Sequence, residues 1–189
     1  MTRRKKRTTK AENFVYNHDE LVSLIKKHYQ LLIDMAYFEP EDVRWPPEPA
    51  GWSAEDLNVN ALQILGRDIK VIQLLRHIPY PRKKNTEPPE VDEQQMWWLK
   101  AKALSFKEFF DKIRTQMSTL TLVPAPAVGD LGKSIMHSGD SGSEGIKQLY
   151  YECGWPGPLR KEEFLQKVVP VREAGIQEIS HRYDEFHKS

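Results

Sequence analysis

The sequence predicts a mainly α protein, a single irregular helical domain with long Pro-rich connections and room for a few short strands, with an α+β fold as the alternative. Three observations lead to this prediction. Several segments repeat apolar residues at three- and four-residue spacing, which is typical of amphipathic helices. The 13 prolines gather between those segments, where they oppose continuous helix. A length of 189 residues suits one domain with its own core.

The first predicted helix covers residues 18–38 and has the clearest helical pattern in the chain. Its apolar face repeats at helical spacing and consists of Leu21, Leu24, Ile25, His28, Leu32 and Met35. Asn17 or Asp19 can cap its start. Prolines and a glycine then predict an extended, partly polyproline-like segment over residues 39–52.

Two shorter helices are expected next. Ser53 is typical of an N-cap, and Gly66 is typical of the stop that would end the helix it begins. The following helix places Ile69 and Ile72 on one side, and Pro79 ends it. Residues 81–95 then combine three prolines with mixed charge, which predicts an exposed loop.

A further helix is predicted from Ser105 onward. Four large apolar residues share one of its faces, namely Phe106, Phe109, Phe110 and Ile113. Residues 96–104, which precede it, alternate in part and fit either a helix or a strand.

The last third of the chain is predicted with less regularity. Residues 118–126 should be extended, and residues 127–145 should form a flexible Gly/Ser-rich loop. Residues 146–153 are predicted as a strand. Two helical segments, separated or kinked at Pro170, follow it.

Positive charge is concentrated at the N-terminus. Of the 28 basic and 27 acidic residues, six basic and no acidic ones lie in the first ten positions, so the rest of the chain is net acidic. A domain that binds nucleic acid usually concentrates positive charge on its folded body. We therefore expect a disordered basic arm over residues 1–13 and a globular domain over residues 14–187, with nucleic acid contacted only through the arm. The arm also fits a nuclear import signal, formed by Arg3, Arg4, Lys5, Lys6 and Arg7.

Cysteine use and hydropathy indicate where the protein works. The single cysteine, Cys153, excludes an internal disulfide and suits a reducing compartment. No apolar run is long enough to cross a membrane, and the residues after the basic start are too polar for a secretory signal. The expected location is inside the cell, in the nucleus or the cytoplasm, without membrane contact.

Residues 127–134 fit the loose pattern of a phosphate-binding loop, in which a Gly-rich turn ends in Gly-Lys-Ser. Such a loop follows a buried strand and opens a regular helix whose N-terminus faces the phosphates. Pro124 and Pro126 oppose a central strand before this loop, and the residues after Ser134 have low helix propensity. Nucleotide binding is therefore not predicted.

No other motif in the sequence defines a reaction. The histidines are scattered without metal-ligand spacing, and Cys153 has no recognisable nucleophile signature. An enzyme would need a pocket that joins His137, Asp140 and Cys153 near the loop at residues 127–145. We predict no catalytic residue, no metal site and no cofactor.

Aromatic and arginine side chains, which are enriched in binding hot spots, mark the Pro-rich half of the chain. The candidate protein-binding residues are Arg44, Trp45, Trp52, Arg76, His77 and Tyr80. An alternative interpretation is that Trp45 and Trp52 anchor the rigid segment on the first helix.

Two stretches, YQLLIDMAYFEPEDVRWPPEPAGW and LGRDIKVIQLLRHIPY, lie within residues 29–80. Together they resemble a set of small proteins of filamentous fungi without an established activity. In that set a helix leads through a Tyr-x-x-Pro turn to Pro-Pro and Gly-Trp, and then to a helix that ends in Leu-Leu-Arg-His-x-Pro-Tyr. The resemblance implies a fungal, intracellular protein and assigns no catalytic residue.

The predicted function is a non-catalytic protein-interaction or accessory role inside the cell, with the nucleus as one candidate location and an unidentified protein as partner. One alternative is a small accessory enzyme of fungal secondary metabolism with a site near residues 127–145. A second alternative is contact with nucleic acid through the basic arm.

Overall fold

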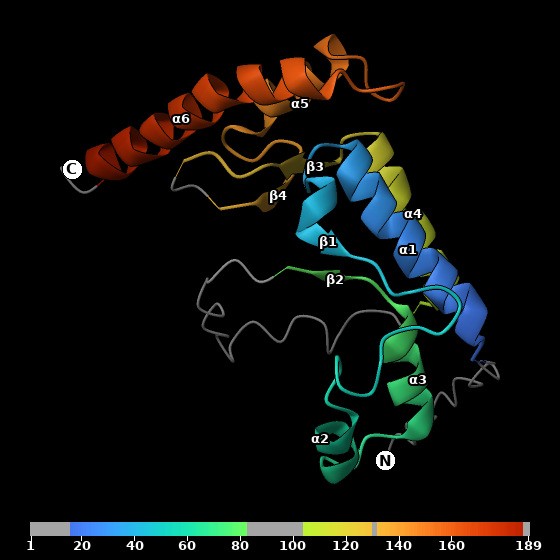
Figure 1. Ribbon diagram of the computed structural model, residues 1–189. Helices are drawn as coiled ribbons and strands as arrows, with labels where there is room; N and C mark the ends of the chain where they lie inside the picture. The colour runs from blue at the N-terminus through green and yellow to red at the C-terminus, as the bar shows by residue number, and fades with distance from the viewer. Residues whose placement is uncertain (1–15, 83–103, 130–131, 187–189) are drawn as a thin grey trace, which may run out of the picture.

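The computed structural model describes residues 16–82, 104–129 and 132–186. The mainly α prediction is confirmed, because these residues form six α-helices and two short antiparallel sheets of two strands each. Helices α5 (Ser143–Glu152) and α6 (Lys161–Phe186) lie at one end of the molecule, and α2 (Val59–Ile64) and α3 (Ile69–His77) lie at the other (Figure 1). Two side-by-side helices connect these ends (Figure 1).

The first connecting helix, α1 (His18–Asp34), confirms the predicted amphipathic helix. Asn17 is its N-cap, and the Asn17 side chain accepts a hydrogen bond from Glu20 N at 3.2 Å. Leu21, Leu24 and Leu32 are buried, as the spacing predicted. The helix therefore packs its apolar stripe inward and leaves its polar residues outside.

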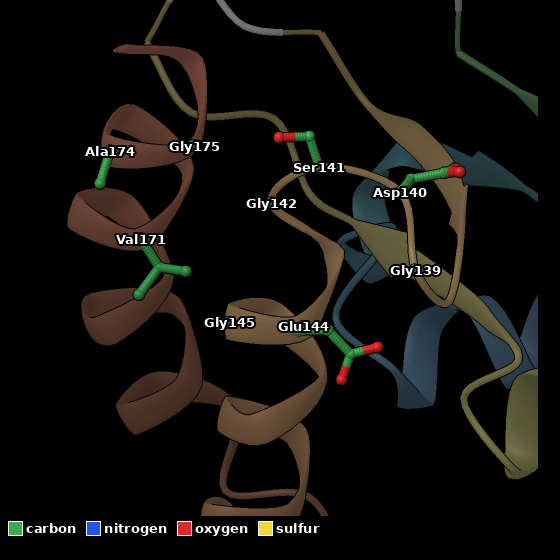
Figure 2. Close-up of a pocket in the computed structure, with 9 residues that line it drawn as sticks. All are labelled: Gly139, Asp140, Ser141, Gly142, Glu144, Gly145, Val171, Ala174 and Gly175. Carbon is green, nitrogen blue, oxygen red and sulfur yellow. The ribbon is translucent and has the colours of Figure 1, made fainter. Parts of the chain in front are cut away.

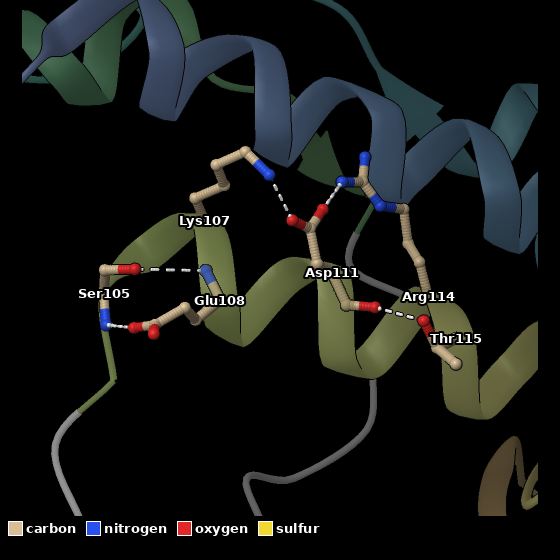
Figure 3. A network of polar contacts seen from close by, with 6 residues as sticks. All are labelled: Ser105, Lys107, Glu108, Asp111, Arg114 and Thr115. Carbon is tan, nitrogen blue, oxygen red and sulfur yellow. Dashed lines mark hydrogen bonds and ion pairs between the residues drawn. The ribbon is translucent and has the colours of Figure 1, made fainter.

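The second connecting helix, α4 (Phe106–Ser118), begins in a capping box. Glu108 N donates to Ser105 Oγ at 3.2 Å, and Ser105 N donates to Glu108 Oε2 at 2.8 Å (Figure 3). Glu20, near the start of α1, contributes to the raised pKa of Lys107, near the start of α4, so the N-terminal ends of the two helices lie near each other. The two helices therefore run in the same direction, which requires the long connection between them.

The connection after α1 wraps back onto α3. It contains a 3-10 turn, η1 (Pro40–Asp42), and a strand, β1 (Val43–Arg44), which pairs with β2 (Tyr80–Pro81) after α3. Gly51 has φ +72°, and a Cβ there would lie 2.5 Å from Arg76 O. Only glycine allows this close approach. The backbone bond from Trp52 N to Arg76 O, 2.8 Å long, follows from it.

The helix predicted from Ser53 is shorter than expected. Ser53 and Asp56 exchange backbone-to-side-chain hydrogen bonds of 3.1 and 3.2 Å, but this pair closes a turn rather than a helix. Asn58, at φ 48°, then caps α2. Gly66, at φ +67°, follows the C-cap of α2 as predicted, whereas Ile69 at the start of α3 is 58% exposed and is not part of the core.

Two predictions for the last third of the chain are wrong. Residues 134–137, assigned to a flexible loop, form strand β4 (Ser134–His137), which pairs with β3 (Leu122–Ala125). Residues 146–153, assigned to a strand, belong mostly to α5. Ile146, Leu149, Tyr150 and Cys153 are all buried, and their spacing is that of one helical face.

Helix α6 continues through Pro170 without a break, so the expected separation into two helices is also wrong. Proline removes one backbone hydrogen bond from a helix interior. Phe164 and Val168, six and two residues before Pro170, are buried, and α6 packs along α5. Burial of this face holds α6 together across the missing bond.

The core lies where α1, α4, β3, α5 and α6 meet. Tyr150 is fully buried there, and its hydroxyl lies 2.8 Å from both Met35 O and Pro124 O. Trp155 is also buried, and its indole donates to Ser118 O at 3.1 Å, so it anchors the turn after α5 to the end of α4. No helix in the described parts of the chain is long and apolar enough to cross a membrane.

Candidate interaction groove

The predicted binding residues around the Pro-rich segment are largely engaged within the chain. The Trp52 indole is buried and donates to Ile78 O at 2.9 Å. Arg76 Nε donates to Trp52 O at 2.8 Å, and Arg76 Nη2 donates to Ala50 O at 3.3 Å. These bonds tie the Pro-rich segment to α3, which is an anchoring role.

Three of the other four predicted binding residues, Arg44, Tyr80 and His77, lie at the same contact. The Arg44 guanidinium lies 4.8 Å from the Trp52 ring centre. Tyr80 donates to Leu75 O at 2.7 Å, and the Tyr80 pKa is raised to about 12, mainly by burial. His77 Nδ1 donates to Gln73 O at 2.8 Å, while Trp45 is 38% exposed. The structure thus brings Arg44, His77 and Tyr80 to Trp52 and Arg76, whereas Trp45, which follows Arg44 in the chain, is an exposed aromatic residue.

The basic residues Arg3, Arg4, Lys5, Lys6 and Arg7 lie outside the described residues, as does the whole predicted arm over residues 1–13. The import prediction therefore stays a prediction.

Residues 127–134 lead into strand β4 rather than into a helix. Lys133 Nζ forms an ion pair with Asp42 Oδ2 at 2.6 Å and lies 4.3 Å from the Phe38 ring centre. The helix N-terminus that faces phosphates in a nucleotide site does not follow this loop. Instead, the ion pair between Lys133 and Asp42 links the loop to η1.

The pocket that Asp140 lines does not include the other two residues that the enzyme alternative requires. An open pocket of about 430 Å³ between α5 and α6 is lined by Asp140, Ser141 and Glu144, and neither His137 nor Cys153 lines it (Figure 2). His137 N donates to Asp140 Oδ2 at 2.7 Å, so this carboxylate closes a turn.

Glycine explains why a hollow forms at this position. A Cβ at Gly145 would lie 2.8 Å from Val171 Cγ1, so α5 and α6 approach each other closely only because residue 145 lacks a side chain. The pocket beside them is the space that small residues leave (Figure 2).

Cys153 does not have the environment of a reactive thiol. Its side chain is fully buried at the end of α5, and burial, followed by the nearby Glu163 carboxylate, raises the pKa of the thiol. Across the described residues, no group of three or more His, Cys, Asp or Glu side chains is placed to hold a metal ion.

An apolar hollow lies between α1, α3 and α4, and we call it the α4 groove. It has a volume of about 890 Å³. Leu21 and Ile25 contribute from α1, and Leu74 contributes from α3. The α4 side is formed by Leu104, Phe106, Phe109, Phe110, Lys112, Ile113 and Gln116.

Two phenylalanines of α4 are unusually exposed for their size. Phe106 is 42% exposed and Phe109 is 44% exposed, whereas Met117, at the far end of the same helix, is buried in the core. Contiguous exposed apolar surface on a folded chain marks an interaction site more often than scattered apolar residues do. The α4 groove is therefore a candidate interaction surface.

Charged residues lie on both sides of α4. Asp111 accepts from Lys107 at 2.5 Å and pairs with Arg114, and this network lies on the side facing α1 (Figure 3). These contacts hold the pKa of the Asp111 carboxyl below its usual range. Lys112 lines the α4 groove.

A histidine lies near the inner end of the groove. The His28 ring is 5.7 Å from the Phe110 ring, and its Nδ1 is buried without a hydrogen-bond partner among the described residues. Burial and, to a smaller extent, Arg114 lower the pKa of His28. The neutral imidazole therefore acts as an apolar ring in the α1–α4 contact.

The sequence identified the four apolar residues of α4 as one helical face but did not identify the groove. Leu21, Ile25 and Leu74 come from two other helices, and their approach to Phe106 and Phe109 depends on the tertiary structure. The sequence feature that could have indicated a groove was the aromatic face of α4, because the rest of that helix has low hydrophobicity. No family model matches the chain, and no curated protein or solved structure matches it either.

Proposed function

We propose that the protein is a non-catalytic interaction protein that binds an amphipathic helix of a partner protein in the α4 groove. The observation that carries this proposal is the exposure of Phe106 and Phe109 beside apolar side chains from α1 and α3. Helix-binding grooves recognise partners through apolar anchors at positions i, i+4 and i+7. The α4 groove offers the matching apolar surface.

The dimensions of the groove favour a helix as its occupant. The α4 residues from Phe106 to Gln116 line it along a helical path of about 15 Å, close to three helical turns. A small-molecule pocket encloses most of its ligand, whereas Phe109 is still 44% exposed at this surface. An elongated apolar groove open on one side fits the apolar stripe of a helix.

Methyl NMR tests this proposal. The probe is a synthetic helical peptide of about 18 residues with leucines at i, i+3, i+4 and i+7 and glutamines on its polar face. The methyl groups of Ile25 and Ile113 line the groove, and Ile146 is a core control. We expect saturable shifts at Ile25 and Ile113 and none at Ile146.

Three outcomes contradict the proposal. One is the absence of saturable binding. Another is dimerisation of the free protein with the same methyl shifts, which would assign the groove to a second copy of the chain. The third is peptide binding that appears only after Trp97 and Trp98 are replaced by serine, which would assign the groove to the chain's own residues 96–99.

A further inference from the structure

We propose that two copies of the chain associate through the corner between α2 and α3. The corner comprises residues 63–71, all nine of which are exposed. It lies at the end of the molecule away from α5 and α6 (Figure 1). None of these nine residues lines the α4 groove. The corner is therefore a second interaction surface, and the contact leaves the groove of each copy open.

Apolar side chains are concentrated at the corner. Ile64 is 85% exposed, Leu65 is 67% exposed and Ile69 is 58% exposed, and Val71 follows at 43%. A single exposed leucine is ordinary on a folded protein. Four exposed aliphatic residues within eight positions instead concentrate apolar surface in the way that marks an interaction site.

The short helix α2 also indicates that another surface covers the corner. It has six residues, and none of them is buried. A helix shorter than about 12 residues is marginal in water by itself, so it depends on packing against its surroundings. At Gly66, a Cβ would meet no described atom within 4 Å, so the backbone there is open to close approach. A surface that packs on Ile64 and Leu65 would supply the packing that α2 lacks.

The charges at the corner fit a second copy of the same surface. Arg67 and Lys70 are basic and Asp68 is acidic, and no ion pair joins any of them to another described residue. A two-fold axis that passes close to the bond between residues 67 and 68 sets Arg67 of each copy opposite Asp68 of the other. Adjacent charges of both signs are thus complementary to themselves, whereas a strongly acidic or strongly basic partner lacks this match.

The size of the surface predicts a reversible dimer. The exposed apolar area of the four aliphatic side chains is on the order of 300 Å² per copy. A stable interface buries about 800 Å² per partner, so polar neighbours must supply the rest and the contact lies at the weak end of the range. Such a dimer carries two α4 grooves, and a partner with two helices would bind both with higher avidity than one.

Sedimentation equilibrium of the full chain tests the proposal. We expect a monomer–dimer equilibrium with a Kd of about 10–100 μM. Ile64→Asp should raise this Kd at least about 30-fold, because it buries an unpaired charge from each copy. Arg67→Glu should raise it about tenfold at about 0.05 M salt and less at about 1 M salt.

Two control variants make the same kinds of change elsewhere on the exposed surface. Ile135→Asp replaces an exposed isoleucine of β4, and Lys27→Glu reverses an exposed charge of α1. Each should change the Kd less than about twofold. Ile64→Asp should leave Tm within about 2 °C of the parent chain, because the side chain it replaces is exposed.

A chain that stays monomeric at about 500 μM would overturn the proposal. A dimer that Ile64→Asp and Ile135→Asp weaken equally would also overturn it. Dimerisation that shifts the methyl signals of Ile25 and Ile113 but not those of Ile64 would place the contact in the α4 groove instead. A monomer that binds anionic lipid vesicles through Ile64 would assign the corner to a membrane surface. A monomer that Ile64→Asp unfolds would assign it to the chain's own residues.

Discussion

Replacing Tyr150 by phenylalanine should destabilise the fold more than any other loss of a single hydroxyl in the described chain. The Tyr150 hydroxyl is fully buried and lies 2.8 Å from both Met35 O and Pro124 O. A hydroxyl has one proton to donate, so the two carbonyl groups share it. These carbonyls follow α1 and belong to β3, so the hydroxyl joins segments that are distant in the sequence.

The expected loss of stability follows from the burial of the groups that the Tyr150 hydroxyl contacts. Tyr150→Phe keeps the ring and leaves two buried carbonyl oxygens without this donor. A buried polar group that loses its partner costs about 1–3 kcal/mol, and we expect about 2 kcal/mol here. For a chain of this size each kcal/mol lowers Tm by about 2–4 °C, so Tm should fall by about 4–8 °C.

The assay is urea unfolding together with thermal unfolding, and the neighbouring tyrosine provides the control. Tyr151 is 45% exposed, so Tyr151→Phe should change stability by less than about 0.5 kcal/mol. If Tyr150→Phe also stays within about 0.5 kcal/mol, the hydroxyl does not bridge the two carbonyls and the account of the core is wrong.

Three further predictions concern pH, anchoring and location. The pKa of His28 is lowered in the fold and has its ordinary value of 6.5 in the unfolded chain, so protonation favours the unfolded chain. The free energy of unfolding should therefore fall as the pH drops below about 6.5. In urea unfolding measured at several pH values, His28→Leu should make that fall smaller. Trp52→Ala should cost about 3–5 kcal/mol and Trp45→Ala less than about 1 kcal/mol; similar Tm losses would contradict the anchoring role. A fluorescent fusion should lose nuclear enrichment when residues 3–7 are deleted, and an unchanged distribution would contradict the import signal.

The long helices could be predicted because their local signals agree with their tertiary contacts. α1 has an N-cap and a complete apolar stripe, and Ser105 begins α4 with a capping box. The prediction of a strand over residues 146–153 is wrong, although the adjacent Tyr150 and Tyr151 are of a residue type that favours strands. The helical spacing of Ile146 and Tyr150, which face the core, was the better indicator.

β4 and the α4 groove depend on distant partners, and this is why the sequence did not predict them. β4 lacks a strand-like apolar pattern and forms by pairing with β3, as in the pair Val123–Met136. The groove needs Leu21 and Leu74 on either side of an aromatic face, and no local pattern specifies that approach. The resemblance to fungal proteins stays a prediction.

The affinity of the neutral helical peptide for two variants tests the central claim most directly. Phe109 in the groove and Ile135 on β4 are both 44% exposed, so replacing either by serine removes a similarly exposed apolar side chain. If the α4 groove binds a helix, Phe109→Ser should raise Kd at least about 30-fold, as expected when an anchor worth about 2 kcal/mol is lost. Ile135→Ser should raise Kd less than about twofold. Equal effects of the two variants, or no effect of Phe109→Ser in a protein that stays folded, would contradict the account.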